Sequence, residues 1–154
     1  MTTKALVFAL LAGFAASAAA QDLTWRKDVA PIVKKRCAGC HGPKAPDYGE
    51  WMLLDDAKRK KVAPRLDAYP NFMNHVVWPA TGSVMRRLDD GSSTGGKPGN
   101  MHKYLGGDDA ERAKNLATIK AWLGEGAWNL NRFGERDGVP GVTKEQLEKI
   151  KAKY

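Results

Sequence analysis

Cys37, Cys40 and His41 form a Cys-x-x-Cys-His pattern, in which a histidine directly follows the second of two cysteines. This pattern is the sequence signature of a covalently attached c-type haem. On one helical turn the two thiols can reach the two vinyl groups of a porphyrin, while the next imidazole arrives beneath the iron. The sequence therefore predicts thioether bonds from Cys37 and Cys40, with His41 as the proximal axial ligand.

Three other chemistries of these residues are less well supported. A structural zinc site usually needs four thiolate or imidazole ligands, but the chain has only two cysteines, and His75 and His102 lack zinc-finger spacing. A thioredoxin-type redox pair follows a strand, and no Val/Ile-rich run precedes Cys37. A simple disulfide would leave His41 without a role. Haem attachment is the interpretation that uses all three residues.

The first 20 residues have the composition of a secretory signal peptide. Lys4 is followed by an apolar run over residues 5–14 and by small residues up to Ala20. Residues 5–20 are fewer and less apolar than the roughly 20 residues that span a bilayer. We expect cleavage before Gln21, export to the periplasm and no transmembrane segment in the mature chain. Export agrees with haem attachment, which occurs after the chain leaves the cytoplasm.

The chain is basic, with 25 Lys and Arg against 17 Asp and Glu and a net charge of +8. Signal cleavage removes Lys4, and two haem propionates would leave about +5, which attracts acidic surfaces. We therefore expect redox protein partners with acidic docking surfaces. Nucleic acid is not expected, because the chain is secreted and has no recognisable nucleic-acid-binding motif. The length predicts one domain, which we expect to be a monomer.

The helix that carries the cysteines is expected to begin at Asp28 as N-cap, with Pro31 in its first turn. The free N–H of a ligating histidine usually donates to a carbonyl that fixes the ring. Pro43 and Pro46 follow His41 in a loop, and the sequence does not choose between their carbonyls.

Three further helices are predicted. Asp108 or Asp109 caps the clearest one, whose apolar positions recur every three or four residues until Gly124 and Gly126 end it. Ser83 caps a short helix over residues 84–88, and a capping box of Thr143 and Gln146 begins the last one, up to Tyr154. The apolar positions of the clearest helix are Ala113, Leu116, Ile119 and then Trp122 or Leu123.

Residues 68–79 carry large side chains that should form core or haem-pocket wall. Within them, Trp78 could donate its indole N–H to a propionate. Arg86 and Arg87, in the short helix that follows, are candidates for pairing with propionates.

Six side chains are candidates for the distal iron ligand, and an open site is a further alternative. Met101 follows the glycine-rich loop 92–100 and precedes the clearest helix, so that the docked helix would hold it in place. Met73 lies in an aromatic cluster and Met85 in a short amphipathic helix, where core packing is the ordinary role of methionine. The full set is Met52, Met73, Met85, Met101, His75 and His102.

Several stretches together resemble class I cytochromes c, most closely the small monohaem periplasmic cytochromes of Gram-negative bacteria. They are residues 29–32, 36–42, 53–55 and 83–88, and Met101 ahead of a helix that contains Ile119, Trp122 and Leu123. The resemblance covers about residues 28–124. It implies an all-α class I cytochrome c fold around one covalent haem, with Met101 as the distal ligand and Trp122 packed against the first helix.

The chain departs from this family at two places. Asn100 and His102 flank Met101 instead of the usual Met-Pro or Lys-Met setting. Residues 127–154 have no counterpart. We therefore expect a signal peptide over residues 1–20, a cytochrome c domain over 21–126, and a C-terminal extension over 127–154 that packs on the same domain and ends in an extra helix.

The predicted function is periplasmic one-electron transfer by haem c with His41 and Met101 as axial ligands. No nucleophile, acid–base pair or metal cluster in the sequence suggests bond-making chemistry, so an enzyme is not expected. Two alternatives stay open. The chain could be a haem subunit of a periplasmic oxidoreductase complex that docks through residues 127–154. It could also be a gas-binding or peroxidase haem protein with an open sixth site.

Overall fold

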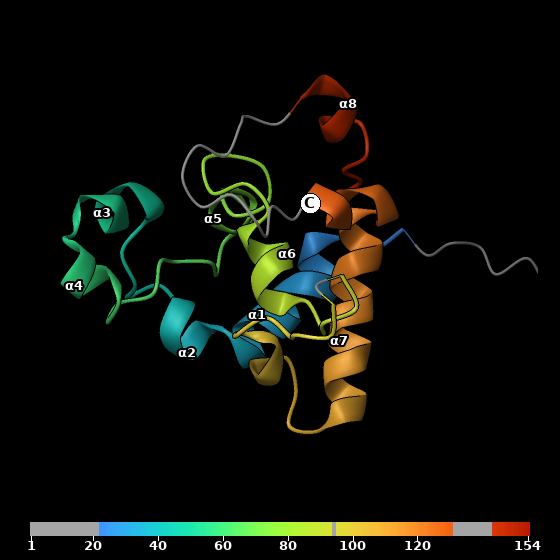
Figure 1. The fold of residues 1–154 in the computed structure, drawn as a ribbon, viewed down its shortest axis with the longest axis horizontal. Helices are drawn as coiled ribbons and strands as arrows, with labels where there is room; N and C mark the ends of the chain where they lie inside the picture. The colour runs from blue at the N-terminus through green and yellow to red at the C-terminus, as the bar shows by residue number, and fades with distance from the viewer. Residues whose placement is uncertain (1–21, 94, 131–142) are drawn as a thin grey trace, which may run out of the picture.

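The computed structural model describes residues 22–93, 95–130 and 143–154, so the expected signal peptide lies outside the described residues. The described parts are helical and contain no strand (Figure 1), which confirms the all-α prediction. A single parallel bridge joins Thr24 to Lys153. None of the described helices combines the length and apolar character needed to cross a bilayer.

The helices are short except for α7. In chain order they are η1 (Trp25–Val29), α1 (Ala30–Arg36), α2 (Ala38–His41), α3 (Tyr48–Leu53), α4 (Asp56–Arg59), α5 (Tyr69–Met73), α6 (Ser83–Leu88), η2 (His102–Tyr104), α7 (Asp109–Leu123), η3 (Glu125–Leu130) and α8 (Lys144–Leu147). Helices α1 and α7 lie at the centre, and α3 and α4 project to one side (Figure 1).

The first helical segment begins earlier than predicted. Thr24 is the N-cap of the π-helical turn η1, and its side chain accepts a hydrogen bond from Lys27 N at 3.2 Å. The carboxylate of Asp28 accepts one from Thr24 N at 2.7 Å. The prediction that Asp28 is the N-cap is therefore wrong, because Thr24 supplies a capping hydroxyl one turn earlier. Segment η1 continues directly into α1, whose first turn contains Pro31.

Helix α7 forms where the sequence predicted it. Asp108 is its N-cap and accepts a hydrogen bond from Glu111 N at 2.8 Å, and Gly124, with φ +94°, ends it. Its buried side chains are Leu116, Ile119, Trp122 and Leu123. The indole rings of Trp122 and Trp25 lie 5.8 Å apart. Trp122 thus packs at the start of the first helical segment, as the resemblance implied.

The C-terminal segment is only partly helical. The capping box of Thr143 and Gln146 is present, but α8 ends at Leu147, so the expectation of a helix up to Tyr154 is wrong. Residues 148–150 form turns on α8, and the backbone then bonds to the core: Lys153 O accepts from Trp25 N and from Trp122 Nε1, both at 2.8 Å. Lys151 N donates to Leu123 O at 2.9 Å. These long-range bonds replace the backbone bonds that a continued helix would form.

Candidate haem site

Cys37, Cys40 and His41 lie on one tight helical turn. Cys37 closes α1 and is the N-cap of α2, and its carbonyl accepts hydrogen bonds from Cys40 N at 3.1 Å and His41 N at 2.8 Å. Both cysteines are free thiols, so they do not form a disulfide. The local backbone therefore holds two thiols and an imidazole in the order that a c-type haem requires.

The ring of His41 is fixed by a carbonyl that the sequence analysis did not identify. His41 Nδ1 lies 2.7 Å from Pro64 O. Since a carbonyl only accepts, Nδ1 carries the proton, and a neutral imidazole then has its lone pair on Nε2. The predicted acceptors, Pro43 and Pro46, are wrong: Pro46 O accepts from Arg65 N, and Leu66 N donates to His41 O, both at 2.9 Å. These bonds hold the segment that contains Pro64 beside His41.

The electrostatic surroundings keep this imidazole neutral, which is the form that binds a metal. Burial lowers the pKa of His41, the hydrogen bond to Pro64 opposes that change, and the positive charge of Arg87 lowers the pKa further. Burial also raises the pKa of the Cys37 thiol to about 11. Reactive dithiols have depressed thiol pKa values, so Cys37 does not resemble half of a redox-active pair.

The described residues contain no group of three or more His, Cys, Asp or Glu side chains that could hold a metal ion. A zinc site built from protein ligands alone therefore has no support in this part of the chain. An iron carried by a porphyrin needs only the axial ligands from the protein.

Met101 is held against the end of α6. Met101 N donates to Arg87 O at 2.9 Å, and Gly99 N donates to Asp89 O at 2.8 Å. A Cβ at Gly99 would lie 2.4 Å from the carbonyl oxygens of Arg86 and Arg87, so only glycine permits this approach. The Met101 side chain is partly buried against the core. By contrast, Met85 is fully buried within the core, as its predicted packing role requires.

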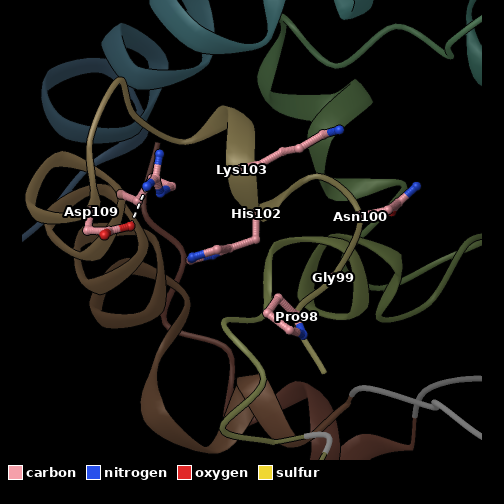
Figure 2. A pocket seen from close by; sticks show the side chains of 7 residues that line it. Pro98, Gly99, Asn100, His102, Lys103 and Asp109 are labelled. Carbon is pink, nitrogen blue, oxygen red and sulfur yellow. Dashed lines mark hydrogen bonds and ion pairs between the residues drawn. The ribbon is translucent and has the colours of Figure 1, made fainter. Parts of the chain in front are cut away.

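The neighbouring His102 faces a different part of the molecule. Its Nδ1 lies 3.1 Å from Leu88 O. Figure 2 shows its ring pointing toward Asp109, while Asn100 and Lys103 extend the other way. The cavity beside the ring does not include Cys37, Cys40 or His41. The residues that line it are Pro98, Gly99, Asn100, His102, Lys103, Asp109 and Arg112.

His75 is buried and contacts Tyr48 and Ser83. The residue is 7% exposed, and its ring lies edge-on to Tyr48 with centroids 5.3 Å apart. Its Nδ1 lies 2.9 Å from Ser83 Oγ. Burial lowers the pKa of His75 to about 4, and the charges of His41, Arg87 and Arg86 act in the same direction.

Ser83 is not the cap that the sequence predicted. The N-cap of α6 is Gly82, in a left-handed conformation with φ +70°, and the hydroxyl of Ser83 contacts His75 instead. The burial of His75 agrees with the prediction that most of residues 68–79 form core or haem-pocket wall, but the sequence did not predict its contact with Ser83. The three residues that the sequence suggested as propionate partners are Trp78, Arg86 and Arg87. The side chain of Trp78 is 63% exposed. The two arginines bond within the protein: Arg86 Nη1 donates to Thr81 O, and Arg87 Nη1 donates to Asn100 Oδ1.

These residues fit a c-type haem on two observations. Two free thiols lie one turn apart, and His41 has its lone pair on Nε2. Cys37 and Cys40 would hold the porphyrin, and His41 would bind the iron.

Comparisons with known proteins are consistent with this site. The family model described as PccH cytochrome c matches residues 24–154. The solved structure of the monohaem cytochrome PccH from Geobacter sulfurreducens is similar to this chain, with a TM-score of 0.70 and 41% sequence identity. The match covers 86% of this chain and 99% of that one. None of the curated proteins searched matched the chain.

Proposed function

The chain belongs to the PccH cytochrome c family, and from this premise we propose that it is a periplasmic one-electron carrier with His41 and Met101 as axial ligands. The predicted likeness to small monohaem class I cytochromes c is confirmed. Membership indicates a haem protein that transfers electrons. The periplasmic location is supported by the signal-peptide composition of residues 1–20.

The contact that carries the proposal is the hydrogen bond from His41 Nδ1 to Pro64 O at 2.7 Å, directly after the two cysteines. It selects the tautomer whose Nε2 can bind iron and holds the ring in one orientation. The bond joins residues 23 positions apart, so it forms only in the folded chain.

The protein residues have separate tasks in this proposal. When bound, haem supplies a reversible one-electron change between ferric and ferrous iron. Cys37 and Cys40 would hold it covalently, and His41 would be one iron ligand. Met101 would be the other, and its thioether would favour ferrous iron and so raise the reduction potential. If both residues bind the iron, small molecules would be kept from it.

The test is a mass and a spectrum of protein exported with a bacterial haem-attachment machinery. We expect an N-terminus at Gln21 and the mass of one haem that survives acid and acetone, because the chain has one Cys-x-x-Cys-His pattern. Redox titration should give a one-electron curve. Free thiols at both Cys37 and Cys40 would refute haem attachment. Prompt carbon monoxide binding by the reduced protein would instead indicate an open sixth site.

A further inference from the structure

Asp89 is the first residue of the loop that connects α6 to η2 and ends at Met101, here called the Met101 loop. Its backbone carbonyl accepts a hydrogen bond from Gly99 N at 2.8 Å, two residues before Met101. Its side-chain Oδ1 accepts from Gly91 N at 2.8 Å and from Ser93 N at 3.2 Å. This one residue therefore fixes both the beginning and the end of the Met101 loop.

The second oxygen of the Asp89 carboxylate binds a residue of the C-terminal extension. Trp128, in η3, donates from its indole Nε1 to Asp89 Oδ2 at 2.8 Å, and the two residues lie 39 positions apart. Both are buried, so the bond is shielded from water. The ammonium of Lys120, in α7, lies 4.9 Å from the centre of the Trp128 ring. Trp128 thus connects the Met101 loop to the C-terminal part of the core.

The place of Met101 is determined by the loop more than by its own side chain. Met101 N donates to Arg87 O at 2.9 Å. A Cβ at Gly99 would lie 2.4 Å from the carbonyl oxygens of Arg86 and Arg87, so the loop meets α6 in close backbone contact. The Met101 side chain is only partly buried. A displacement of the loop would therefore move the Met101 thioether with it.

We propose that Trp128 is a positioning residue for the distal iron ligand: its indole N–H holds Asp89, and Asp89 holds the loop that keeps the Met101 thioether on the iron. This inference rests on the proposed function, because it requires Met101 to be the distal ligand. It gives the C-terminal extension a task inside the cytochrome. A charge-assisted hydrogen bond between buried groups is strong enough for this task.

The test compares Trp128→Phe with Trp122→Phe in the oxidised, haem-loaded protein. Trp122 is the matched control, because it is also buried and its Nε1 donates to Lys153 O at 2.8 Å, a bond outside the Met101 loop. Each variant is heated while the methionine-to-iron charge-transfer band and the circular dichroism of the helices are recorded. We expect Trp128→Phe alone to widen the interval between loss of the band and unfolding, relative to wild type.

Carbon monoxide binding by the reduced protein gives the size of the effect. We expect Trp128→Phe to bind carbon monoxide about tenfold faster than wild type, the change in equilibrium that follows from the loss of one charge-assisted hydrogen bond. Trp122→Phe should bind it at the wild-type rate. Asp89→Asn keeps the size of the side chain but loses one acceptor oxygen. It should therefore accelerate binding as well, and it serves as the test if Trp128→Phe does not fold.

Hydrogen exchange at the backbone N–H groups of Gly99 and Met101 measures the loop independently of the iron. We expect faster exchange at both positions in Trp128→Phe and wild-type exchange in Trp122→Phe. Equal behaviour of the two tryptophan variants in the band and in exchange would overturn the proposal, as would a wild-type carbon monoxide rate in Asp89→Asn. A wild-type protein that lacks the band would instead refute the ligand assignment of the proposed function, and the proposal with it.

Discussion

Met101 is the residue on which the electronic properties of the proposed site depend most. If its sulfur binds iron, the oxidised protein has a weak methionine-to-iron charge-transfer band at the red end of the spectrum. We predict that Met101→Ala abolishes this band, lowers the reduction potential by removing the ligand that favours ferrous iron, and opens the reduced iron to carbon monoxide. Absorption spectra and a redox titration measure all three effects.

Met85→Ala is the matched control, because Met85 is the same residue type but lies fully buried in the core. Truncating a buried methionine costs about 2 to 5 kcal/mol of folding free energy. The control should therefore be less stable yet keep the band. If Met85→Ala removes the band and Met101→Ala keeps it, the distal ligand has been assigned to the wrong methionine. If only His102→Ala changes the spectrum, the iron has two histidine ligands.

Asp89 is a buried carboxylate that shapes the loop before Met101. Its Oδ1 accepts from Gly91 N at 2.8 Å and Ser93 N at 3.2 Å, and its Oδ2 accepts from Trp128 Nε1 at 2.8 Å. We predict that Asp89→Asn lowers the free energy of unfolding by about 1–3 kcal/mol, because an amide nitrogen cannot accept. Trp128→Phe, which removes one of the three bonds, should have the smaller effect in denaturant titrations.

The pH dependence of this contribution follows from the pKa of Asp89. Burial alone would raise that pKa, but hydrogen bonds from Trp128, Gly91 and Ser93 outweigh burial and lower it. Because the folded-state pKa is depressed, the stabilisation is complete above the ordinary Asp value of about 4. It is lost as the pH falls through the folded-state value. The stability difference between wild type and Asp89→Asn should narrow over this acidic range, and a constant difference would contradict an ionised Asp89.

At the scale of elements, one glutamate joins the haem-attachment helix to α7. Glu111 forms ion pairs with Arg36 and Lys35 of α1, the latter at 3.0 Å, and accepts from Gly107 N at 2.9 Å. The hydrogen bond from Arg36, the backbone N–H of Gly107 and Lys35 hold the pKa of Glu111 well below its usual range. Arg36 directly precedes Cys37, so this contact helps to place the haem-attachment turn.

We predict that Glu111→Gln lowers the melting temperature at neutral pH. The folded-state pKa of Glu111 is depressed, so the stabilisation by its ionised side chain is complete at pH values above the ordinary Glu pKa of about 4.3. This stabilisation is lost as the pH falls below that value toward the folded-state pKa. The difference between wild type and variant should shrink when melting is followed by circular dichroism at acidic pH and when salt is raised. Glu148→Gln, an exposed change outside these contacts, is the control.

Local signals in the sequence predicted the elements that depend on local interactions. Neighbouring residues determine the capping aspartate and apolar spacing of α7 and the motif at Cys37, so these features could be predicted from the sequence. Features that depend on residues distant in the sequence could not be predicted. Pro64 O bonds to His41 from 23 residues away, and the backbone leaves the helical path after Leu147, where Lys151 and Lys153 bond to α7 and η1. The aromatic stretch predicted that residues 68–79 are core, and His75 is buried, but its contact with Ser83 depends on the fold and could not be predicted.

For the whole molecule, the excess of positive charge should govern encounters with partners. The net charge is +8, and the loss of Lys4 with the expected signal peptide changes it by only one. Several of these charges are exposed beside the projecting helix α4, including Lys58, Lys60 and Lys61. A net positive protein attracts anionic surfaces at long range, and salt screens this attraction over a Debye length of about 8 Å at physiological ionic strength.

We predict that electron exchange with negatively charged reagents slows as ionic strength rises, because screening weakens the attraction before contact. Stopped-flow oxidation of the reduced protein by an anionic metal complex should show this fall. A cationic complex of similar potential should show the opposite trend, since salt then screens repulsion. We expect the rate of electron exchange with an acidic redox protein to fall with ionic strength in the same way. Rates independent of salt for both reagents would contradict the prediction. The net positive charge would then not influence the encounter, and an apolar contact would have to guide docking instead.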